Sequence, residues 1–493
     1  MKMNQLLLRG FQNSFVLSVT IAAIAIIVIV ISMERSVIAA ESVAYTTENI
    51  SYNGKNFAIQ VITVDLKDPF LRVMPVVAAE GIGAVESFES MVERNGAVAA
   101  VNGTFFNAYE ADPYIRFPNG LMIKSGEVIH SGGNQALSVL INKLPLVEYL
   151  KTEVEILVKR NGNAPYSINT WGINKYYGSD AVDQVVLYTS DFGTSISYSG
   201  GTKVVIEEKK ITQITTNAVM IPPNGYVIFI GNTENNKQNI ISELRVGGEV
   251  QIKSTLTRNS GTFDSANWEA AIGVGPKLLT NGQVDVNFAR DGFDDPKITS
   301  SSNARSFVGV NQNKELVMGT TVTSATIPEL ANVLKAYGLT DAMNMDGGSS
   351  SALYAEGVVK RSPGRLLSNA LIVKRYAEPQ VQVMVNSKFV NEFRGYIFKE
   401  KTMVPFRGIF ERIQATFQWD GDARVLKAQR GNTTLVLRPD NLTAEVNGKA
   451  VTLDVAPTIR EGRIYIPLRF VAETLGAQVT WDQSLYRASL TIK

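Results

Sequence analysis

The chain of 493 residues contains no cysteine and only one histidine, His130. The absence of cysteine excludes disulfides, thiolate zinc sites and cysteine nucleophiles. A single histidine excludes metal sites with several histidine ligands, and any Ser-His-Asp arrangement would have to use His130. The chemistry must therefore rest on carboxylates, amides, hydroxyls, lysine and arginine.

The chain also lacks an excess of either charge, with 48 basic against 46 acidic residues. This balance argues against a nucleic-acid partner. The length exceeds the roughly 100–200 residues of one domain, so more than one domain is expected. Hydrophobic residues make up 45% of the chain, with 21 Phe and 17 Tyr, which is enough for folded cores.

Residues 1–40 have the pattern of an export signal. Lys2 and Arg9 precede an apolar run over residues 15–33, and Val37-Ile38-Ala39 supplies small residues for cleavage. The run is longer than the ~7–15 residues of a typical signal and close to the ~20 that span a bilayer. We expect a secreted or cell-surface protein, in contact with the membrane only if this segment stays uncleaved.

Residues 41–377 read as a strand-rich α+β domain. Short alternating or apolar segments are separated by Gly, Asn and Pro, as is typical of strands in a mixed sheet. The predicted strands are 57–64, 98–101, 137–141, 185–189, 204–206 and 226–230. Helices are predicted only over 85–94 and 329–337.

Residues 378–493 contain an internal repeat. The pattern Val404-Pro405-Phe406-Arg407 returns 62 residues later as Ile466-Pro467-Leu468-Arg469, and Trp419 returns as Trp481. Each copy predicts a strand hairpin, a short helix and a strand through the tryptophan. We expect one small α+β domain built from two repeats of about 60 residues.

The segment 344–351 contains a carboxylate, Asp346, followed directly by two glycines and three serine hydroxyls. A capping box at Thr326 and Glu329 opens the helix upstream, and Gly338 ends it. An apolar strand then leads into Asp346. The glycines favour close approach of a ligand, and their N–H groups favour a nest for anionic oxygens. The alternative is an Asp-Gly turn that closes a hairpin.

Two further segments place polar groups at strand ends. In 101–107, Asn102 and Thr104 follow a buried strand and precede two phenylalanines, which suits sugar recognition; the alternative is a turn with a phenylalanine core. In 117–130, a hairpin ends at His130. A lone histidine is more often structural, but His130 offers the only side chain with an ordinary pKa near neutrality.

Weaker candidates lie between these segments. Arg305 leads into an apolar strand, where it could clamp a phosphate or remain an exposed surface residue. Gly273-Val274-Gly275 fits neither a P-loop nor a dinucleotide fingerprint. The acidic loop 291–295 lacks the full spacing of a Ca²⁺ loop, so no metal or other cofactor is predicted.

In this order, the segments 101–107, 273–279, 305–309 and 344–350 resemble the phosphodiester glycosidases. That family includes the enzyme that uncovers mannose 6-phosphate by removing N-acetylglucosamine from a phosphodiester. Two positions depart from the family pattern: Ser349 replaces a third glycine, and Ala304-Arg305-Ser306 replaces Pro-Arg-Thr.

The resemblance implies an extracellular hydrolase that cleaves a sugar-1-phosphodiester, similar to N-acetylglucosamine-1-phosphodiester, in an envelope glycan or glycolipid. Asp346 would be the acid/base or nucleophilic carboxylate, and His130 a second proton carrier. The groups expected to bind phosphate oxygens are Arg305, Gly347, Gly348, Ser349 and Ser350, and those expected to bind sugar hydroxyls are Asn102 and Thr104.

The repeat region is similar to copper amine oxidase N-terminal-like domains of secreted bacterial proteins. It has no histidine or cysteine, so the usual copper ligands are missing. We expect a stalk or a module that binds wall or envelope polysaccharide. Two alternatives to a phosphodiester glycosidase stay open. One is a non-catalytic glycan-binding or envelope-structural protein, and the other is an ordinary glycosidase that pairs Asp346 with another carboxylate.

Overall fold

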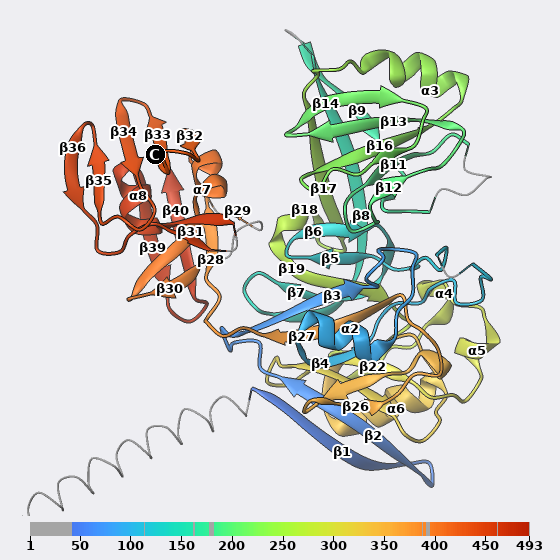
Figure 1. Ribbon diagram of the computed structural model, residues 1–493. Coiled ribbons are helices and arrows are strands. Elements are labelled where there is room, and N and C mark those ends of the chain that lie inside the picture. Colours follow the sequence, from blue (N-terminus) through green and yellow to red (C-terminus); the bar gives the residue numbers. More distant parts are fainter. Residues whose placement is uncertain are drawn as a thin grey trace, which may run out of the picture. The chain divides into compact units, whose positions relative to one another are not determined.

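The computed structural model describes residues 42–112, 114–160, 163–176, 182–386, 388–390, 395–460 and 462–492. The predicted export signal over residues 1–40 lies outside these ranges. Within them, no helix is both long and apolar enough to span a bilayer. The elements are mostly strands, as Figure 1 shows, so the prediction of a strand-rich fold with few helices is confirmed.

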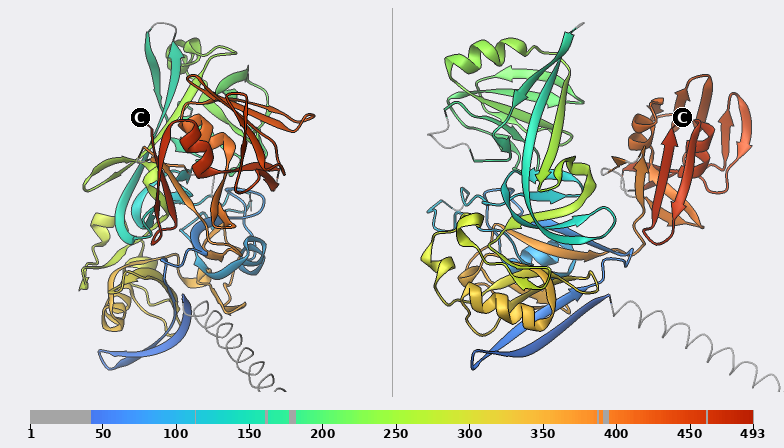
Figure 2. Two further views of the ribbon diagram at one scale, coloured as in Figure 1. Left: turned by 90° about the vertical axis from the view of Figure 1, so that its left-hand side faces the viewer. Right: turned by 180° about the vertical axis from the view of Figure 1, so that it is seen from behind.

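Two antiparallel sheets form the part of the molecule that carries residues 346–350, Asp-Gly-Gly-Ser-Ser, which we call the DGGSS segment. The first sheet, in spatial order, contains β1 (Val43–Tyr52), β2 (Lys55–Val64), β23 (Leu316–Thr321), β22 (Ser306–Asn311), β24 (Leu339–Asn344), β20 (Lys277–Thr280) and β21 (Gln283–Val284). The second sheet contains β26 (Val358–Arg361), β25 (Leu353–Ala355), β4 (Ala97–Asn102), β27 (Asn369–Arg375) and β3 (Leu71–Val77). The hairpin of β1 and β2, in blue, forms one edge of the first sheet (Figure 2).

The two predicted helices cover these sheets. Helix α6 (Ile327–Tyr337) has the predicted capping box between Thr326 and Glu329, and it ends at Gly338 with φ 106°. Its apolar residues pack with Phe307 of β22 in one buried cluster. Helix α2 (Phe88–Asn95) is capped by Ser87 and lies against β4 and β27 of the second sheet.

The middle of the chain adds a third and a fourth sheet. The third sheet contains β18 (Gly261–Asp264), β17 (Val250–Arg258), β8 (Pro145–Arg160), β7 (Gly133–Leu140), β19 (Trp268–Val274), β5 (Met122–Lys124) and β6 (Glu127–His130), with β9 (Asn163–Asn169) paired to β8. The fourth contains β10 (Gly172–Ile173), β11 (Val185–Tyr188), β16 (Gly225–Gly231), β13 (Gly201–Glu207) and β14 (Lys210–Thr215).

Short elements connect these sheets. They are the two-stranded pair β12 (Ser195–Ile196) and β15 (Val219–Met220), the helices α3 (Glu234–Asn239), α4 (Phe288–Asp291) and α5 (Pro296–Thr299), and the 3₁₀ turns η1 (Ile241–Glu243), η2 (Ser265–Asn267) and η3 (Gly348–Ser350).

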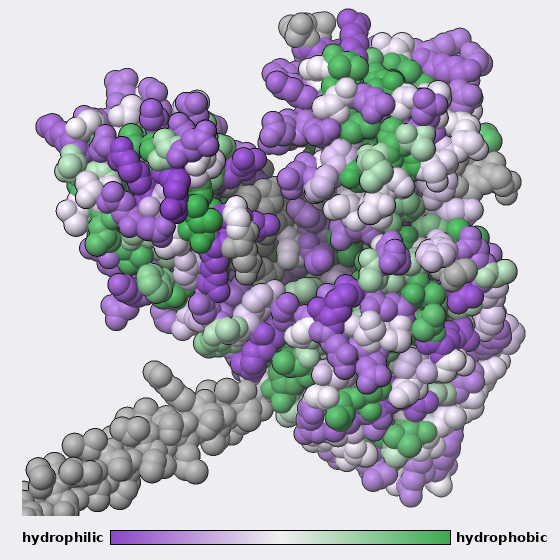
Figure 3. Space-filling model, in the orientation of Figure 1, coloured by the Kyte–Doolittle hydropathy of each residue, from purple (hydrophilic) through white to green (hydrophobic). Residues whose placement is uncertain are grey.

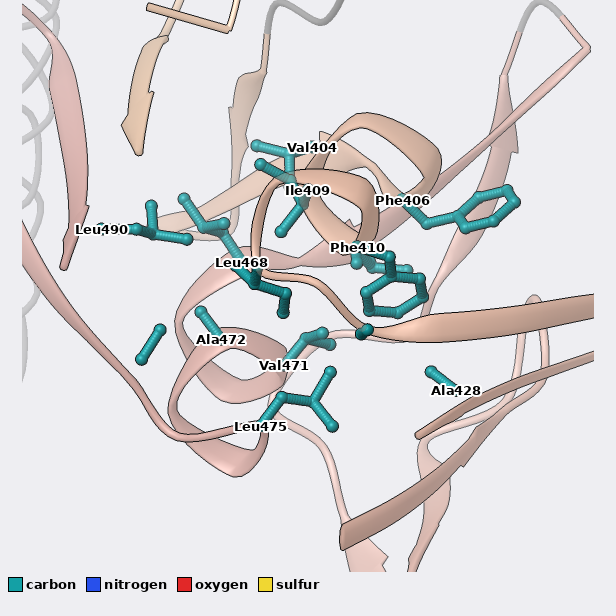
Figure 4. Packing of buried hydrophobic residues seen from close by; sticks show 14 of the residues in the cluster. Val404, Phe406, Ile409, Phe410, Ala428, Leu468, Val471, Ala472, Leu475 and Leu490 are labelled. Carbon is teal, nitrogen blue, oxygen red and sulfur yellow. The ribbon is translucent and has the colours of Figure 1, made fainter. Parts of the chain in front are cut away.

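Residues 381–490 share one buried hydrophobic cluster that includes Ile409, Phe410, Leu468 and Val471 (Figure 4). The elements around it are β28 (Gln382–Val385), β29 (Lys388–Phe389), β30 (Tyr396–Phe398), β31 (Lys401–Pro405), α7 (Phe406–Arg412), β32 (Thr416–Asp420), β33 (Val425–Arg430), β34 (Thr433–Leu437), β35 (Thr443–Val446), β36 (Lys449–Thr452), β37 (Thr458–Arg460), β38 (Arg463–Pro467), α8 (Leu468–Thr474), β39 (Ala477–Asp482) and β40 (Arg487–Ile492). On the face in Figure 3, hydrophilic residues predominate over these strands and apolar ones form small groups.

A buried ionic cluster joins the second sheet to the third. Glu269 of β19 is 1% exposed. Its carboxylate oxygens form ion pairs with the Lys143 Nζ at 2.5 Å and with the Nε of Arg72 of β3 at 3.6 Å. Charges this far from water are tolerated only when they are paired. The cluster therefore fixes how β3 and β19 pack.

Glu269→Gln should lower the melting temperature strongly, because it leaves Lys143 and Arg72 as buried charges without a carboxylate. Breaking one partner of such a cluster typically costs about 3–5 kcal/mol. The control is Glu249→Gln, which removes an exposed pair with Lys159 and should leave the melting temperature nearly unchanged. Equal melting temperatures for the two variants would contradict a structural role for the cluster.

Candidate functional site

The DGGSS segment crosses from the first sheet to the second. Strand β24 ends at Asn344, Asp346 and Gly347 follow, and η3 leads into β25 of the second sheet. The hairpin alternative is therefore wrong, because β24 and β25 belong to different sheets.

The Asn102 side chain fastens both ends of this crossover. Its Nδ2 donates to the Asp346 carbonyl oxygen at 2.7 Å, and its Oδ1 accepts from the Ala352 N–H at 3.0 Å. The side chain is 1% exposed. Both amide atoms therefore bind backbone, and Asn102 has a positioning role that differs from the predicted contact with sugar hydroxyls.

The two glycines have different reasons to be glycine. A Cβ at Gly347 would lie 3.0 Å from the Ala304 carbonyl oxygen, so a side chain there would be crowded. Gly348 has φ 59°, in the left-handed region that glycine enters without cost. The close approach of Gly347 to Ala304 lets the Gly348 N–H donate to the Ala304 carbonyl oxygen at 2.8 Å.

The predicted anion nest is not open in this structure. The Gly347 N–H donates to the Asp346 carboxylate at 2.9 Å, and the Gly348 N–H is bonded to Ala304. Both donors that were expected to hold phosphate oxygens are thus engaged within the protein. Their contacts serve to orient the carboxylate and to fix the crossover.

The two serines of the segment face different surroundings. Ser350 is buried and its hydroxyl hydrogen-bonds to the Asp346 carboxylate. Ser349 is exposed, and a Cβ at Gly364 would be 3.5 Å from its own Cβ. That spacing is an ordinary van der Waals contact, so Ser349 would not crowd a side chain at position 364. Of the two, only Ser349 presents its side chain to solvent.

The Asp346 carboxyl group has a shifted pKa. Its carboxyl lies among protein atoms although the residue as a whole is only half-buried, and burial raises the pKa to about 6. The Ser350 hydroxyl, the Gly347 N–H and the Arg365 charge oppose this rise. A carboxyl with a pKa near 6 exchanges its proton readily near neutral pH, which suits acid–base catalysis.

Arg305 points into the protein. Its side chain is 3% exposed; Nε donates to the Ala325 carbonyl oxygen at 2.9 Å, and Nη2 donates to the carbonyl oxygens of Lys297 and Ser301. Burial lowers its pKa below the ordinary value. These contacts hold the loop of α5 against β22, and they differ from the predicted phosphate clamp.

His130 and Thr104 are both buried. The His130 Nδ1 donates to the Gly120 carbonyl oxygen at 2.7 Å, and burial lowers the pKa of the ring to about 3, helped by the Lys175 charge. No hydrogen bond joins His130 to Asp346 among the residues described. The Thr104 N–H donates to Asn369 Oδ1 at 2.8 Å, and its hydroxyl is buried. The structure thus does not bring His130 to the carboxylate, and a neutral ring is a poor proton donor.

Three residues near Asp346 escaped the sequence reasoning. Arg365 interacts electrostatically with the Asp346 carboxylate, and its guanidinium lies 5.2 Å from the ring centre of Tyr109. The Lys297 Nζ lies 3.4 Å from the Tyr109 hydroxyl oxygen. Arg365 follows Ser362-Pro363-Gly364, a turn signal that predicts a loop but does not say what the loop faces.

An aromatic pair flanks the same region. The rings of Phe105 and Phe293 lie 5.8 Å apart, and a Cβ at Gly275 would be 3.1 Å from the Phe293 ring. Asp291 anchors the Phe293 loop, because its carboxylate accepts from Gln135 at 3.0 Å and from the Lys277 N–H at 2.9 Å. In the described part of the chain, no group of three or more acidic or histidine side chains is arranged to hold a metal ion.

The fold and this site are those of a strand-rich domain with a perturbed carboxylate at a crossover between two sheets. Residues 200–374 match the model of the phosphodiester glycosidase family, and residues 383–490 match that of the copper amine oxidase N-terminal domain. Both resemblances predicted from the sequence are thus confirmed. The first interval includes Arg305 and Asp346 but neither Asn102 nor His130. The second contains no histidine or cysteine, so its residues do not fit a copper site.

Solved structures show the same fold at low identity. A hypothetical protein from Synechocystis is 19% identical with a TM-score of 0.57, over 68% of this chain and 62% of that one. A protein described as exported, from Burkholderia pseudomallei, is 17% identical with a TM-score of 0.53, over 65% and 74%. The chain thus spans less than two thirds of the Synechocystis protein.

A third similar structure is that of a named enzyme. The zebrafish N-acetylglucosamine-1-phosphodiester alpha-N-acetylglucosaminidase catalytic domain, auto-inhibited by its pro-peptide, is 13% identical with a TM-score of 0.34, over 68% of this chain and 83% of that one. The superposition is too poor to transfer residue positions. A comparison with curated protein sequences finds no match.

Asn102→Ala should destabilise the protein and abolish the fixed position of Asp346. It leaves the Asp346 carbonyl oxygen and the Ala352 N–H without partners, and each buried unpaired group costs about 1–3 kcal/mol. The melting temperature should therefore fall by several degrees. Asn95→Ala, which removes a helix-surface contact with Met91, is the control and should change it little. A melting temperature for Asn102→Ala equal to that control would refute the positioning role.

Asp346→Asn should raise the melting temperature at pH 8 by a few degrees and leave it unchanged at pH 3.5. The folded-state pKa of about 6 exceeds the ordinary value of 3.8, so the unfolded chain ionises first as pH rises. As pH rises from 3.8 to 6, ionisation of Asp346 therefore lowers the stability of the folded protein, and an asparagine at this position avoids that loss. Glu329→Gln should act in the opposite direction at pH 8, because the Thr326 N–H lowers the pKa of Glu329. A lower melting temperature of Asp346→Asn at pH 8 would contradict the raised pKa.

Proposed function

We propose that the protein is an extracytoplasmic hydrolase that cleaves a sugar-1-phosphodiester linkage in an envelope glycan or glycolipid. The family match over residues 200–374 supports the reaction class. The observation that carries the proposal is the Asp346 carboxyl at the sheet crossover, with its pKa raised to about 6 inside the matched interval. The export pattern of residues 1–40 supports a location outside the cytoplasm.

Asp346 is the catalytic carboxylate in this mechanism, as a base or as a nucleophile. A phosphate leaving group is a weak base, so the departing oxygen needs little help from a general acid. The difficult step is attack at the anomeric carbon, which a carboxylate assists as a base toward water or as a nucleophile. The bond from Gly347 N–H and the bond from Ser350 hold the carboxylate in one orientation.

The neighbouring side chains suit the two halves of such a substrate. Phe105 and Phe293 offer apolar ring faces for a sugar, and the exposed Ser349 offers a hydroxyl. Arg365 supplies positive charge close to the carboxylate. We therefore assign substrate contact to Ser349 and Arg365, and positioning to Asn102 and Arg305.

We also propose that residues 1–40, 41–377 and 378–493 are a signal or anchor, the catalytic domain and an envelope-binding domain of two repeats. Helices α7 and α8 each follow a strand that ends in proline. Those strands, β31 and β38, pair antiparallel with Val404 opposite Ile466, the equivalent positions of the two copies. This pairing supports a duplicated unit related by a local two-fold axis.

The function is tested by measuring free sugar released from a panel of sugar-1-phosphodiesters. Asp346→Asn should lower kcat/KM by about 10²-fold or more, within the usual range for a lost acid–base group. Asp341→Asn, a carboxylate on the same strand β24, is the matched control and should retain activity. For the unmodified enzyme, kcat/KM should fall as pH drops below 6, because protonation removes the reactive carboxylate.

Other outcomes separate the alternatives. Retention on wall polysaccharide without sugar release from any phosphodiester would favour the non-catalytic binding protein. Activity on plain glycosides alone would favour an ordinary glycosidase. A kcat/KM that falls as pH rises through 6 would reverse the role of Asp346 from base to acid.

A further inference from the structure

Two side chains from loops, Tyr109 and Arg365, meet Lys297 of helix α5 close to the DGGSS segment. Tyr109 is 78% exposed, yet it contacts two cations. The Lys297 Nζ lies 3.4 Å from the Tyr109 hydroxyl oxygen and 4.8 Å from the ring centre. The Arg365 guanidinium lies 5.2 Å from the same ring centre and also acts on the Asp346 carboxylate. Arg365 is therefore close to both the exposed tyrosine and the reactive carboxyl.

The convergence brings two positive charges together at Tyr109. In the part of the chain that the structure describes, neither Lys297 nor Arg365 takes part in a salt bridge. The tyrosine hydroxyl accepts hydrogen bonds from both cations, and Lys and Arg side chains carry three and five N–H donors, so further donors remain on each. Two cations at one point are complementary to a group with two negative charges.

Hydrogen bonds to the backbone hold the three segments that carry these side chains. Arg305 Nη2 donates to the Lys297 carbonyl oxygen at 3.3 Å, so the arginine predicted to bind phosphate instead anchors the lysine. The Gly364 N–H donates to the Ser349 carbonyl oxygen at 2.8 Å and ties the Arg365 loop to the DGGSS segment. A bridge between Phe106 and Pro118 closes the Tyr109 loop.

We propose that Lys297, Arg365 and Tyr109 form the subsite for the leaving phosphomonoester, a proposal that rests on the proposed function. Water adds its oxygen to the anomeric carbon, the bond from that carbon to the phosphate oxygen breaks, and the electron pair stays on the phosphate. One water proton goes to Asp346 and then to solvent. The phosphoryl group thereby changes from one negative charge to two.

The second charge develops as the bond breaks, so the subsite stabilises the transition state more than the substrate. Interactions of this kind raise kcat, whereas uniform binding lowers only KM. Lys297 is therefore a specificity residue for the phosphate half of the substrate. The Tyr109 hydroxyl, which accepts from the cations, has its own hydrogen free to donate to a phosphate oxygen.

The kinetic test compares Lys297→Ala with Lys335→Ala, which removes an exposed lysine on α6 that binds Gln283. On a sugar-1-phosphodiester, Lys297→Ala should lower kcat by about 10²-fold with little change in KM, the range for a lost transition-state donor. Lys335→Ala should leave both constants unchanged. Equal kcat values for the two variants would overturn the proposal, and so would a rise in KM alone.

A binding test keeps this inference separable from the proposed function. At pH 8, calorimetry on the full chain carrying Asp346→Asn should detect inorganic phosphate, a dianion, and not dimethyl phosphate, a monoanion. Adding Lys297→Ala should abolish the phosphate signal, and adding Lys335→Ala should preserve it. Phosphate binding that needs Lys297, without sugar release by the unmodified protein, would uphold the subsite and refute the function. Sugar release that needs Asp346, with phosphate binding independent of Lys297, would refute the subsite alone.

Discussion

The amide of Asn102 is the contact on which the site depends. It bonds the backbone at both ends of the crossover from β24 to β25, at Asp346 and at Ala352. A side-chain amide donates through its nitrogen and accepts through its oxygen. Asn102 can therefore join two sheets through one buried side chain, and the orientation of the Asp346 carboxyl follows from that connection.

The site separates the groups that position from the groups that react. Asn102 and Arg305 are buried and bind backbone carbonyls and amides, while Arg365 and Tyr109 on loops and Lys297 on α5 reach the surface. Rigid buried contacts under exposed reactive loops allow a charged substrate to meet groups that are already in place, so little reorganisation is needed during the reaction.

Local rules predicted the elements but could not predict which donors are already used. The capping box of α6, its end at Gly338 and the strand before Asp346 follow from patterns within a few residues. Arg305, in contrast, has a neighbourhood that fits a clamp, and only the fold shows that backbone carbonyl oxygens surround its guanidinium. Arg365 and Lys297 look like ordinary surface charges in the sequence, because their convergence on Tyr109 joins loops that are far apart in the chain.

The fold holds the Asp346 carboxyl in a buried position that keeps its proton to unusually high pH. Infrared difference spectra between the unmodified protein and Asp346→Asn, recorded across pH, measure this directly through the stretching band of the protonated carboxyl. We expect this band to titrate with a midpoint near pH 6. A midpoint near the ordinary aspartate value of about 4 would contradict it.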